Sequence, residues 1–443
     1  MKTQTRWLLG IVTGLILFVL GAVAYNNPPL FSKTVQLEDG TLELSQVAWG
    51  VSSGLMVAFV DTKQYPATEL SKRLAAKGLI AAVMDTQTFV NHLKVPTGQC
   101  VEPTVVSTAL TSLLTHLPPE PTGTQPIVAG LAEGALIPFL NAQAPALLTD
   151  HNLSVGFSLS LPNNLVLCPN SVQAISTATL KSHWRSAWTD QPDAKTGVLV
   201  KELGVMDIRI AAYDTPLDSL LLDELNRSLG QLDSNQPPMP TVEVPTNQPS
   251  ENVTLFYSGD GGWRDLDKTV ASEMVKLNYP VVGVDVLRYF WEHKTPEQAA
   301  ADLSATMAYY RSHWHVKSFV LTGYSFGADI LPVLYNRLPQ QDKDSVSLLV
   351  LIALAETADF EIHVSGWLGS SAGEMGLAPE LAIIPKQKIL CIYGSKEKTE
   401  TACTDLRNTE ATLLELQGGH HFDQDYPKLT RQIIAVYQQK GIN

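Results

Sequence analysis

Apolar residues in the second half of the chain fall in short runs that are separated by longer amphipathic stretches. The short runs predict strands, and the stretches predict helices. We expect strands at 254–257, 281–285, 318–322, 347–353, 388–393 and 412–416, and helices at 267–277, 297–312, directly after 325 and at 427–439. This alternation predicts a parallel sheet covered by helices on both faces. A functional site in such a sheet is expected at the carboxyl ends of its strands.

The first half of the chain repeats the same pattern. Asp85 stands 200 positions before Asp285, and Gly130 stands 193 positions before Gly323. The change of offset is a modest insertion in the first copy, as a diverged duplication would show. Three blocks match in order: 55–61 with 253–260, 74–89 with 274–290, and 126–140 with 318–334.

A stretch rich in Pro, Asn and Ser separates the two copies. Residues 233–252 show no hydrophobic period, so we predict a linker there. The predicted domains are therefore residues 25–232 and 253–443. With 443 residues, 45% of them hydrophobic, the chain is long and apolar enough for two domains with cores of their own.

One turn of the second copy carries a candidate nucleophile. Residues 323–327 read GYSFG, which fits the pattern G-x-S-x-G. In that pattern a strand turns sharply into a helix and exposes the serine hydroxyl, here that of Ser325. The first copy has Ala132 at this position, and alanine has no oxygen that could attack. We therefore predict two tandem α/β-hydrolase-like domains, of which the first is degenerate and the second is catalytic.

A serine nucleophile needs a base, and the base needs an orienting acid. In this class of fold the acid and then the histidine follow the serine along the chain, each after a strand. We predict Glu397 as the acid, with Glu400 and Asp405 as alternatives. His420 is preferred to His421 as the base because it directly follows a pair of glycines.

The oxyanion of the reaction needs donors that are fixed in advance. We expect the backbone N–H of Phe326 to be one donor and the loop at 258–265 to supply another. Gly261 and Gly262 would let the backbone of this loop approach the substrate, and Trp263 would form a wall of the pocket.

Charge and motifs exclude other classes of function. Without Lys2 and Arg6 the chain keeps 29 basic against 44 acidic residues, a net charge of −15, which argues against nucleic acid and against adhesion to anionic lipid by charge alone. The ten histidines include no H-E-x-x-H motif, and the glycine loop lacks the lysine of a P-loop. We predict no metal and no cofactor.

The amino terminus has the pattern of an export signal. Lys2 and Arg6 precede 18 uncharged residues from Trp7 to Ala24, which end in an A-x-A motif. Residues 1–24 are either a cleaved signal peptide or a retained membrane anchor. In both cases the rest of the chain lies outside the cytoplasm.

The four cysteines fall two in each half of the chain. Since an exported chain meets an oxidising compartment, we expect two disulfides. Cys391 and Cys403 would close a short loop around the predicted acid, and Cys100 and Cys168 would form the second pair if the fold brings them together.

Four motifs resemble one known family. The segments FYSGDGGWRDLDK, GYSFGADILP, CIYGSKEKTETAC and GGHHFDQDY are similar to those of the bacterial VirJ/AcvB virulence proteins, and the resemblance covers nearly all of residues 252–440. The long form of this family carries an additional, related amino-terminal domain, as this chain does. The short form has one copy only.

The resemblance implies a periplasmic serine hydrolase that cleaves aminoacylated phosphatidylglycerol, above all lysyl-phosphatidylglycerol, at the membrane surface. Ser325 would attack the aminoacyl ester, with His420 as base and Glu397 as acid. By their position in the motif loops, Asp260, Asp265 and Asp423 are candidates to bind the substrate's amino group. The alternatives are an assembly factor that works with proteins of type IV secretion, and a general carboxylesterase.

Overall fold

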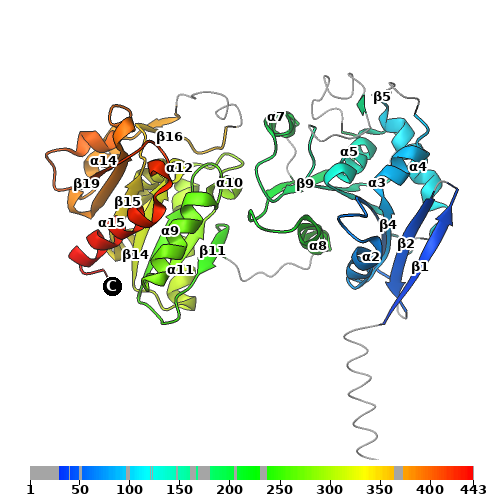
Figure 1. The fold of residues 1–443 in the computed structure, drawn as a ribbon, viewed down its shortest axis with the longest axis horizontal. Coiled ribbons are helices and arrows are strands. Elements are labelled where there is room, and N and C mark those ends of the chain that lie inside the picture. Colours follow the sequence, from blue (N-terminus) through cyan, green and yellow to red (C-terminus); the bar gives the residue numbers. More distant parts are fainter. Residues whose placement is uncertain are drawn as a thin grey trace, which may run out of the picture. The chain divides into compact units, whose positions relative to one another are not determined.

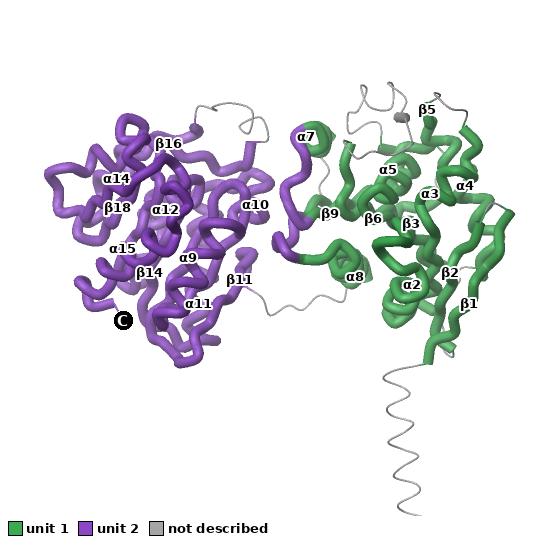
Figure 2. Tube along the Cα trace, in the orientation of Figure 1, with its two compact units in different colours: residues 1–188, 195–209, 215–232 green, residues 189–194, 210–214, 233–443 purple. Residues whose placement is uncertain are grey.

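The computed structural model describes residues 29–442, except 39, 49–51, 96–99, 120, 122, 146–147, 160–165, 168–179, 204–206, 230–236 and 364–372. The predicted export signal lies outside the described residues. In the part that is described, none of the helices has the length and apolarity needed to span a membrane. The chain forms two compact units (Figure 2). Unit 1 is Met1–Trp188, Lys195–Arg209 and Thr215–Leu232; unit 2 is Thr189–Ala194, Ile210–Asp214 and Asp233–Asn443.

Unit 2 is built on a seven-stranded sheet with the order β11-β13-β12-β14-β15-β18-β19 (Figure 1). Every neighbouring pair is parallel except β11 with β13. The central strands are buried on both faces, which fits their unbroken apolar sequences. The strands are β11 (Thr241–Val244), β12 (Asn252–Tyr257), β13 (Val281–Val284), β14 (Ser318–Tyr324), β15 (Val346–Ile352), β18 (Ile389–Gly394) and β19 (Thr412–Leu416).

Helices cover this sheet as the alternating pattern predicts. Helices α9 and α15 pack together over one face, where side chains such as Val270 and Ile433 meet Val320 and Val350 of the sheet. Helices α11 and α12 also pack together and contribute no side chain to that cluster. The helices are α9 (Asp265–Lys276), α10 (Val286–Tyr289), α11 (Pro296–His313), α12 (Phe326–Arg337), α13 (Gln340–Ser345), α14 (Ala378–Ile383) and α15 (Tyr426–Gln439), and a small hairpin joins β16 (Thr357–Ala358) to β17 (Met375–Gly376).

The predicted linker is wrong in part, because residues 241–244 form β11 at the edge of the sheet of unit 2. Val242 and Val244 alternate with polar residues and pack against the core of unit 2. An edge strand of four residues between prolines is too short to produce a clear period in the sequence. Residues 233–236 of the predicted linker lie outside the described residues.

Unit 1 has an eight-stranded sheet with the order β1-β2-β4-β3-β6-β7-β9-β10 (Figure 1). Its strands are β1 (Leu30–Leu37), β2 (Gly40–Val47), β3 (Gly54–Val60), β4 (Leu79–Asp85), β6 (Ile127–Leu131), β7 (His151–Val155), β9 (Trp184–Trp188) and β10 (Ile208–Ile210). A separate pair joins β5 (Cys100–Val101) to β8 (Val166–Leu167). The helices are α2 (Ala67–Ala75), α3 (Thr86–His92), α4 (Pro103–Leu114), α5 (Leu136–Gln143), α7 (Ala194–Glu202) and α8 (Leu217–Ser228).

The two sheets have the same topology. From β2 onward, the strands of unit 1 correspond one by one to those of unit 2, and in each sheet the first of these strands is antiparallel to its neighbour. Asp85 and Asp285 are both helix N-caps: they accept hydrogen bonds from the N–H of Thr88 and Arg288, respectively. The prediction of two tandem α/β-hydrolase-like domains is confirmed.

A disulfide joins Cys391 in β18 to Cys403, with 5.6 Å between the Cα atoms, as predicted. Cys100 lies in β5, whereas Cys168 lies outside the described residues. The pairing of Cys100 with Cys168 therefore stays a prediction.

Candidate active site

Ser325 lies at a sharp turn between β14 and α12, with φ 51° and ψ −121°. Positive φ is unfavourable for a residue with a side chain, so the surroundings must hold this turn in place. The Ser325 N–H donates to the carbonyl oxygen of Ile352 at 2.9 Å, and its own carbonyl accepts from the N–H of Ala328 at 2.7 Å. The helix also passes close to β12: a Cβ added to Gly327 would lie 2.4 Å from the Tyr257 carbonyl oxygen. This position requires glycine.

Three side chains, which follow β14, β18 and β19, meet in one line of hydrogen bonds. His420, which follows β19, has its Nε2 2.8 Å from the Oγ of Ser325. Its Nδ1 lies 2.8 Å from an oxygen of Glu397, in the short 3-10 turn after β18. Of the predicted candidates, the structure brings together Ser325, His420 and Glu397, while Glu400 and Asp405 stand outside this line.

Further contacts hold the loops that carry His420 and Glu397. The Tyr324 hydroxyl lies 3.1 Å from Nδ1 of His421 and 3.3 Å from the carbonyl oxygen of His420. His421 therefore faces Tyr324 instead of Ser325. The N–H of Lys396, next to Glu397, donates to the carbonyl oxygen of Gly418 at 3.0 Å. The acid loop and the histidine loop are thus joined directly.

Ser325 and His420 open onto a pocket of about 200 Å³. Most of its wall comes from the loop after β12 and from the first turn of α9. The rest comes from the sharp turn at Ser325, which we call the elbow, and from the loop that carries His420. It is lined by Gly259, Asp260, Gly261, Gly262, Arg264, Asp265, Leu266, Asp267, Tyr324, Ser325, His420 and His421. Three carboxyl groups therefore face one guanidinium group around the candidate nucleophile.

Two backbone segments lie where an oxyanion would be held. Among the described residues, the N–H of Phe326 at the start of α12 has no protein acceptor. The loop after β12 comes nearest at Gly259, where an added Cβ would lie 3.8 Å from the Cβ of Ser325. Gly261 and Gly262 line the pocket too, but Gly262 packs against Asp285 and Leu287. From the sequence we predicted that Gly261 and Gly262 would approach the substrate, and Gly259 was missed. Its position two residues after β12 could have indicated it.

Two residues predicted to contact the substrate, Trp263 and Asp423, do not line this pocket. Trp263 is 5% exposed and belongs to the core, where its ring fills the space that the missing side chain of Gly283 leaves. Asp423 is not among the pocket-lining residues; its side chain is 61% exposed and lies 3.8 Å from Lys396. Asp260 and Asp265 line the pocket, and their binding of the substrate's amino group stays a prediction.

The acidic groups shape the electrostatics of the site. Burial raises the pKa of the Tyr324 hydroxyl, and the negative charges of Asp267, Asp260 and Glu397 raise it further. Burial also raises the pKa of the Asp267 carboxyl well above its ordinary value. The pocket therefore favours positive over negative groups in a ligand.

Unit 1 keeps the turn but not the reactive groups. Ala132 follows β6 with φ 49°, close to the value at Ser325. An added Cβ at Gly130 would meet the carbonyl oxygen of Gly134, as one at Gly323 would meet that of Gly327. After β10 the sequence reads AAYD where unit 2 has GGHH, so no histidine stands in the corresponding place.

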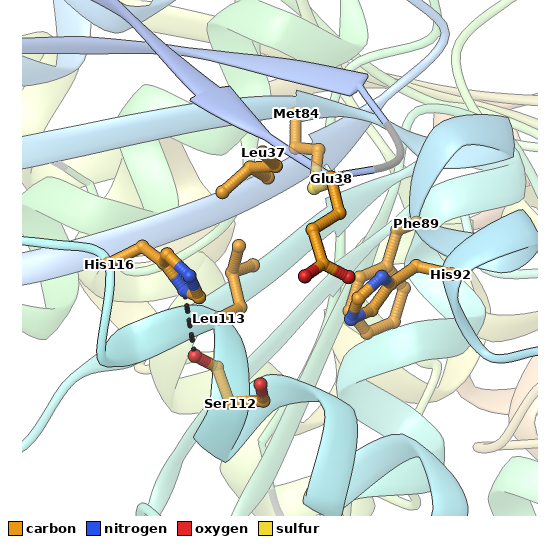
Figure 3. A pocket seen from close by; sticks show the side chains of 8 residues that line it. All are labelled: Leu37, Glu38, Met84, Phe89, His92, Ser112, Leu113 and His116. Carbon is orange, nitrogen blue, oxygen red and sulfur yellow. Dashed lines mark hydrogen bonds between the residues drawn. The ribbon is translucent and has the colours of Figure 1, made fainter.

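Unit 1 also contains a pocket of about 140 Å³ between the β1–β2 hairpin and helices α3 and α4 (Figure 3). Its lining includes Glu38, His92, Ser112 and His116. The Nδ1 of His116 lies 3.1 Å from the carbonyl oxygen of Ser112, not from its hydroxyl. Ser112 lies inside α4 without any sharp turn, so this group does not reproduce the arrangement around Ser325. In the described part of the chain, no three His, Cys, Asp or Glu residues are placed to share a metal ion.

Comparison with known families agrees with this geometry. Residues 251–441 match the family model described as "Bacterial virulence protein (VirJ)". This match covers less than half of the chain. We call this part of unit 2 the VirJ domain. No curated protein matches the chain.

Several solved structures align with about half of the chain. Est1E from Butyrivibrio proteoclasticus is 12% identical and aligns over 46% of this chain and 93% of its own, with a TM-score of 0.34. MenH from S. aureus is 13% identical over 45% of this chain and 98% of its own, with a TM-score of 0.35. An esterase from Pyrobaculum calidifontis is 16% identical over 52% and 93%, with a TM-score of 0.32. At these scores the fold of the VirJ domain rests on its own strand order and elbow.

Proposed function

We propose that the VirJ domain is a serine hydrolase of carboxylic esters, with Ser325 as nucleophile, His420 as base and Glu397 as orienting acid. The observation that carries this proposal is the position of His420. Its two ring nitrogens lie 2.8 Å from Glu397 and 2.8 Å from Ser325, at the edge of a pocket. A serine hydroxyl becomes an effective nucleophile only with such a base beside it.

In the first half of the reaction, the Oγ of Ser325 forms a bond to the ester carbonyl carbon while its proton passes to Nε2 of His420. Glu397 accepts the Nδ1–H of His420 and stabilises the imidazolium that forms. The N–H of Phe326 and the backbone near Gly259 hold the negative carbonyl oxygen. When the tetrahedral intermediate collapses, the carbon–oxygen bond to the alcohol breaks and His420 gives its proton to the leaving oxygen.

In the second half, water attacks the acyl group on Ser325. His420 takes a proton from this water, and the same backbone donors hold the second oxyanion. The acyl–oxygen bond to Ser325 then breaks, the Ser325 oxygen receives the proton, and the free acid leaves. No cofactor is needed to balance either step.

The substrate that we propose is aminoacyl-phosphatidylglycerol, and lysyl-phosphatidylglycerol in particular. The match of residues 251–441 to the VirJ family model supports this choice, as does the acidic lining of the pocket. An aminoacyl ester carries a protonated amino group beside its carbonyl, and Asp260 and Asp265 line the pocket in which that group would lie. Hydrolysis would release the amino acid and leave phosphatidylglycerol.

We further propose that the protein acts outside the cytoplasm, in the periplasm at the membrane surface. The Cys391–Cys403 disulfide supports an oxidising compartment. The export signal predicted from residues 1–24 would take the chain there, either released or anchored.

The decisive experiment replaces Ser325 by alanine. We expect Ser325→Ala to lower kcat for ester hydrolysis by about 10⁴-fold or more with the fold intact, because it removes the attacking oxygen. A fluorophosphonate should label the wild-type protein and not the variant. Ser395→Ala, which changes a serine of the nearby acid loop, is the matched control and should keep both properties. An active Ser325→Ala variant would exclude this mechanism.

The natural substrate is tested separately. Cells that lack the protein should accumulate aminoacyl-phosphatidylglycerol, and cells that express Ser325→Ala should accumulate it equally. A general carboxylesterase would instead cleave short aryl esters and leave the aminoacyl lipids unchanged. If Ser325→Ala restores type IV secretion to cells that need the protein for it, the assembly role is independent of hydrolysis.

A further inference from the structure

Asp267 is a buried acid in the pocket wall that the proposed mechanism does not use. It lies in the first turn of α9, is 3% exposed and is one of the residues that line the pocket with Ser325. Among the described residues, its Oδ1 has no hydrogen-bond partner. A buried carboxyl oxygen without a donor is unfavourable in a folded protein, so it needs an explanation.

The helix itself explains only part of this carboxyl group. Asp267 is the third residue of α9 counted from Asp265, and hydrogen bonding from the N–H of Arg264 and its own N–H lowers its pKa, against the larger effect of burial. This resembles the back-bonding acid of a helix capping box. The capping role leaves Oδ1 unpaired.

The surrounding charges favour a cationic partner for this oxygen. Asp285 and Asp265 are near enough to disfavour the ionised form of Asp267. Among the lining residues, all within the described part of the chain, Arg264 alone carries a permanent positive charge. Its guanidinium is paired with Asp190 at 3.1 Å and lies 3.7 Å from Asp265. An anion at the start of α9 would be repelled by the carboxyl groups of Asp260, Asp265 and Asp267. A cation would be attracted by the same three groups.

We propose that Asp267 determines specificity by accepting, at Oδ1, a hydrogen bond from a primary ammonium group in the acyl part of the ester. This inference rests on the proposed hydrolase function of the same site. The ammonium group supplies the donor that Oδ1 lacks, and the pair forms where water is largely excluded. A neutral acyl group would leave this oxygen without a hydrogen-bond donor. The pocket therefore discriminates against esters that lack an ammonium group.

The test uses three ethyl esters with the same six-carbon acyl chain. The lysine ester has ammonium groups at both the α and ε positions, the norleucine ester has only the α group, and the hexanoate ester has none. We compare full-length wild-type protein with Asp267→Asn, which keeps the shape and the capping oxygen but removes the charge. Asp423→Asn is the matched control, because Asp423 is an exposed acid outside the pocket lining.

We expect Asp267→Asn to lower kcat/KM for at least one of the two ammonium-bearing esters at least tenfold relative to hexanoate, with the hexanoate value within about threefold of wild type. If the lysine-to-norleucine ratio falls, Asp267 binds the ε group; if the norleucine-to-hexanoate ratio falls, it binds the α group. Asp423→Asn should change neither ratio. Unchanged ratios in Asp267→Asn, or an equal loss on all three esters, would overturn the proposal.

A second measurement needs no variant. Lysine amide, norleucine amide and hexanamide are compared for their ability to slow fluorophosphonate labelling of Ser325 in the wild-type protein. At least one of the two ammonium-bearing amides should protect at concentrations tenfold lower than hexanamide does. Equal protection by all three overturns the role of Asp267 without touching the hydrolase function, which fails only if Ser325→Ala stays active.

Discussion

At the scale of single residues, Glu397 determines which nitrogen of His420 carries the proton. An imidazole whose Nδ1–H is donated to a carboxylate presents a bare Nε2, which can accept the proton of a hydroxyl. Since Glu397 lies 2.8 Å from Nδ1, Nε2 is the nitrogen that accepts the proton of Ser325, which lies 2.8 Å away. Without the acid, the same distance between His420 and Ser325 would not make Nε2 the acceptor.

Glu397→Gln tests this dependence. The glutamine amide can donate to Nδ1, which favours the tautomer with the proton on Nε2, so we expect kcat to fall by about 10³- to 10⁴-fold with little change in KM. The measurement is steady-state hydrolysis of a soluble ester. Glu400→Gln, in the same loop, should keep its activity. A Glu397→Gln variant with more than a tenth of wild-type kcat would contradict the assigned role.

Residue-scale prediction from the sequence succeeded where chain order carries the information. Ser325, Glu397 and His420 follow strands in the order that the fold requires, so their meeting could be expected. Trp263 was misplaced because the space it fills is made by Gly283 on the neighbouring strand, which only the folded sheet brings close. Asp267 was missed because an acid in the first turn of a helix is ordinary there.

At the scale of elements, the Cys391–Cys403 disulfide ties the middle of β18 to the short 3-10 turn beyond Glu397. Both cysteines are fully buried, at 0% exposure. The loop between them holds the acid, and its neighbour Lys396 bonds to the histidine loop at Gly418. The crosslink therefore stabilises the fold and restricts the position of Glu397.

We predict that Cys391→Ala combined with Cys403→Ala lowers the free energy of unfolding by about 3 kcal/mol, the entropic effect of opening a loop of this length. Because the loop that carries Glu397 is then less restrained, kcat should fall several-fold. KM should change less than kcat does. Urea unfolding and ester kinetics measure the two effects. Dithiothreitol should lower kcat in the wild type and leave kcat of the double variant unchanged; a fully stable and active double variant would refute the prediction.

Element boundaries in the VirJ domain follow the sequence closely for a physical reason. Central strands such as β14 and β15 are buried on both faces, so their sequences are continuous apolar runs that end where burial ends. Strand β11 escaped detection because an edge strand needs only two inward-facing valines. The contacts of Gly259 with the elbow depend on the loop's path, which no local pattern encodes.

At the scale of the whole molecule, two sheets of the same topology carry very different chemistry. The VirJ domain combines an elbow serine with a histidine and an acid, whereas the eight-stranded sheet has Ala132 at its elbow and is followed by AAYD after β10. A single change in unit 1 cannot restore a base that is missing. The molecule should therefore have one reactive serine.

Ala132→Ser in the background of Ser325→Ala tests this expectation. We predict that the double variant folds, because serine fits the same turn, and that it stays unlabelled by fluorophosphonate and inactive towards esters. Labelling is followed by intact mass, with the wild type as the positive control. Attachment of the probe to residue 132 would show that unit 1 supplies a base from elsewhere.

The turn at Ala132 has a consequence for how this architecture changes over time. An L-residue held at positive φ costs about 1–2 kcal/mol, yet unit 1 keeps φ at 49° with nothing to present there. The turn at Ala132 is therefore maintained by the packing of the sheet, through the close contact of Gly130 with Gly134. A sheet of this topology can therefore lose both the hydroxyl and the histidine while it keeps the turn that would hold them.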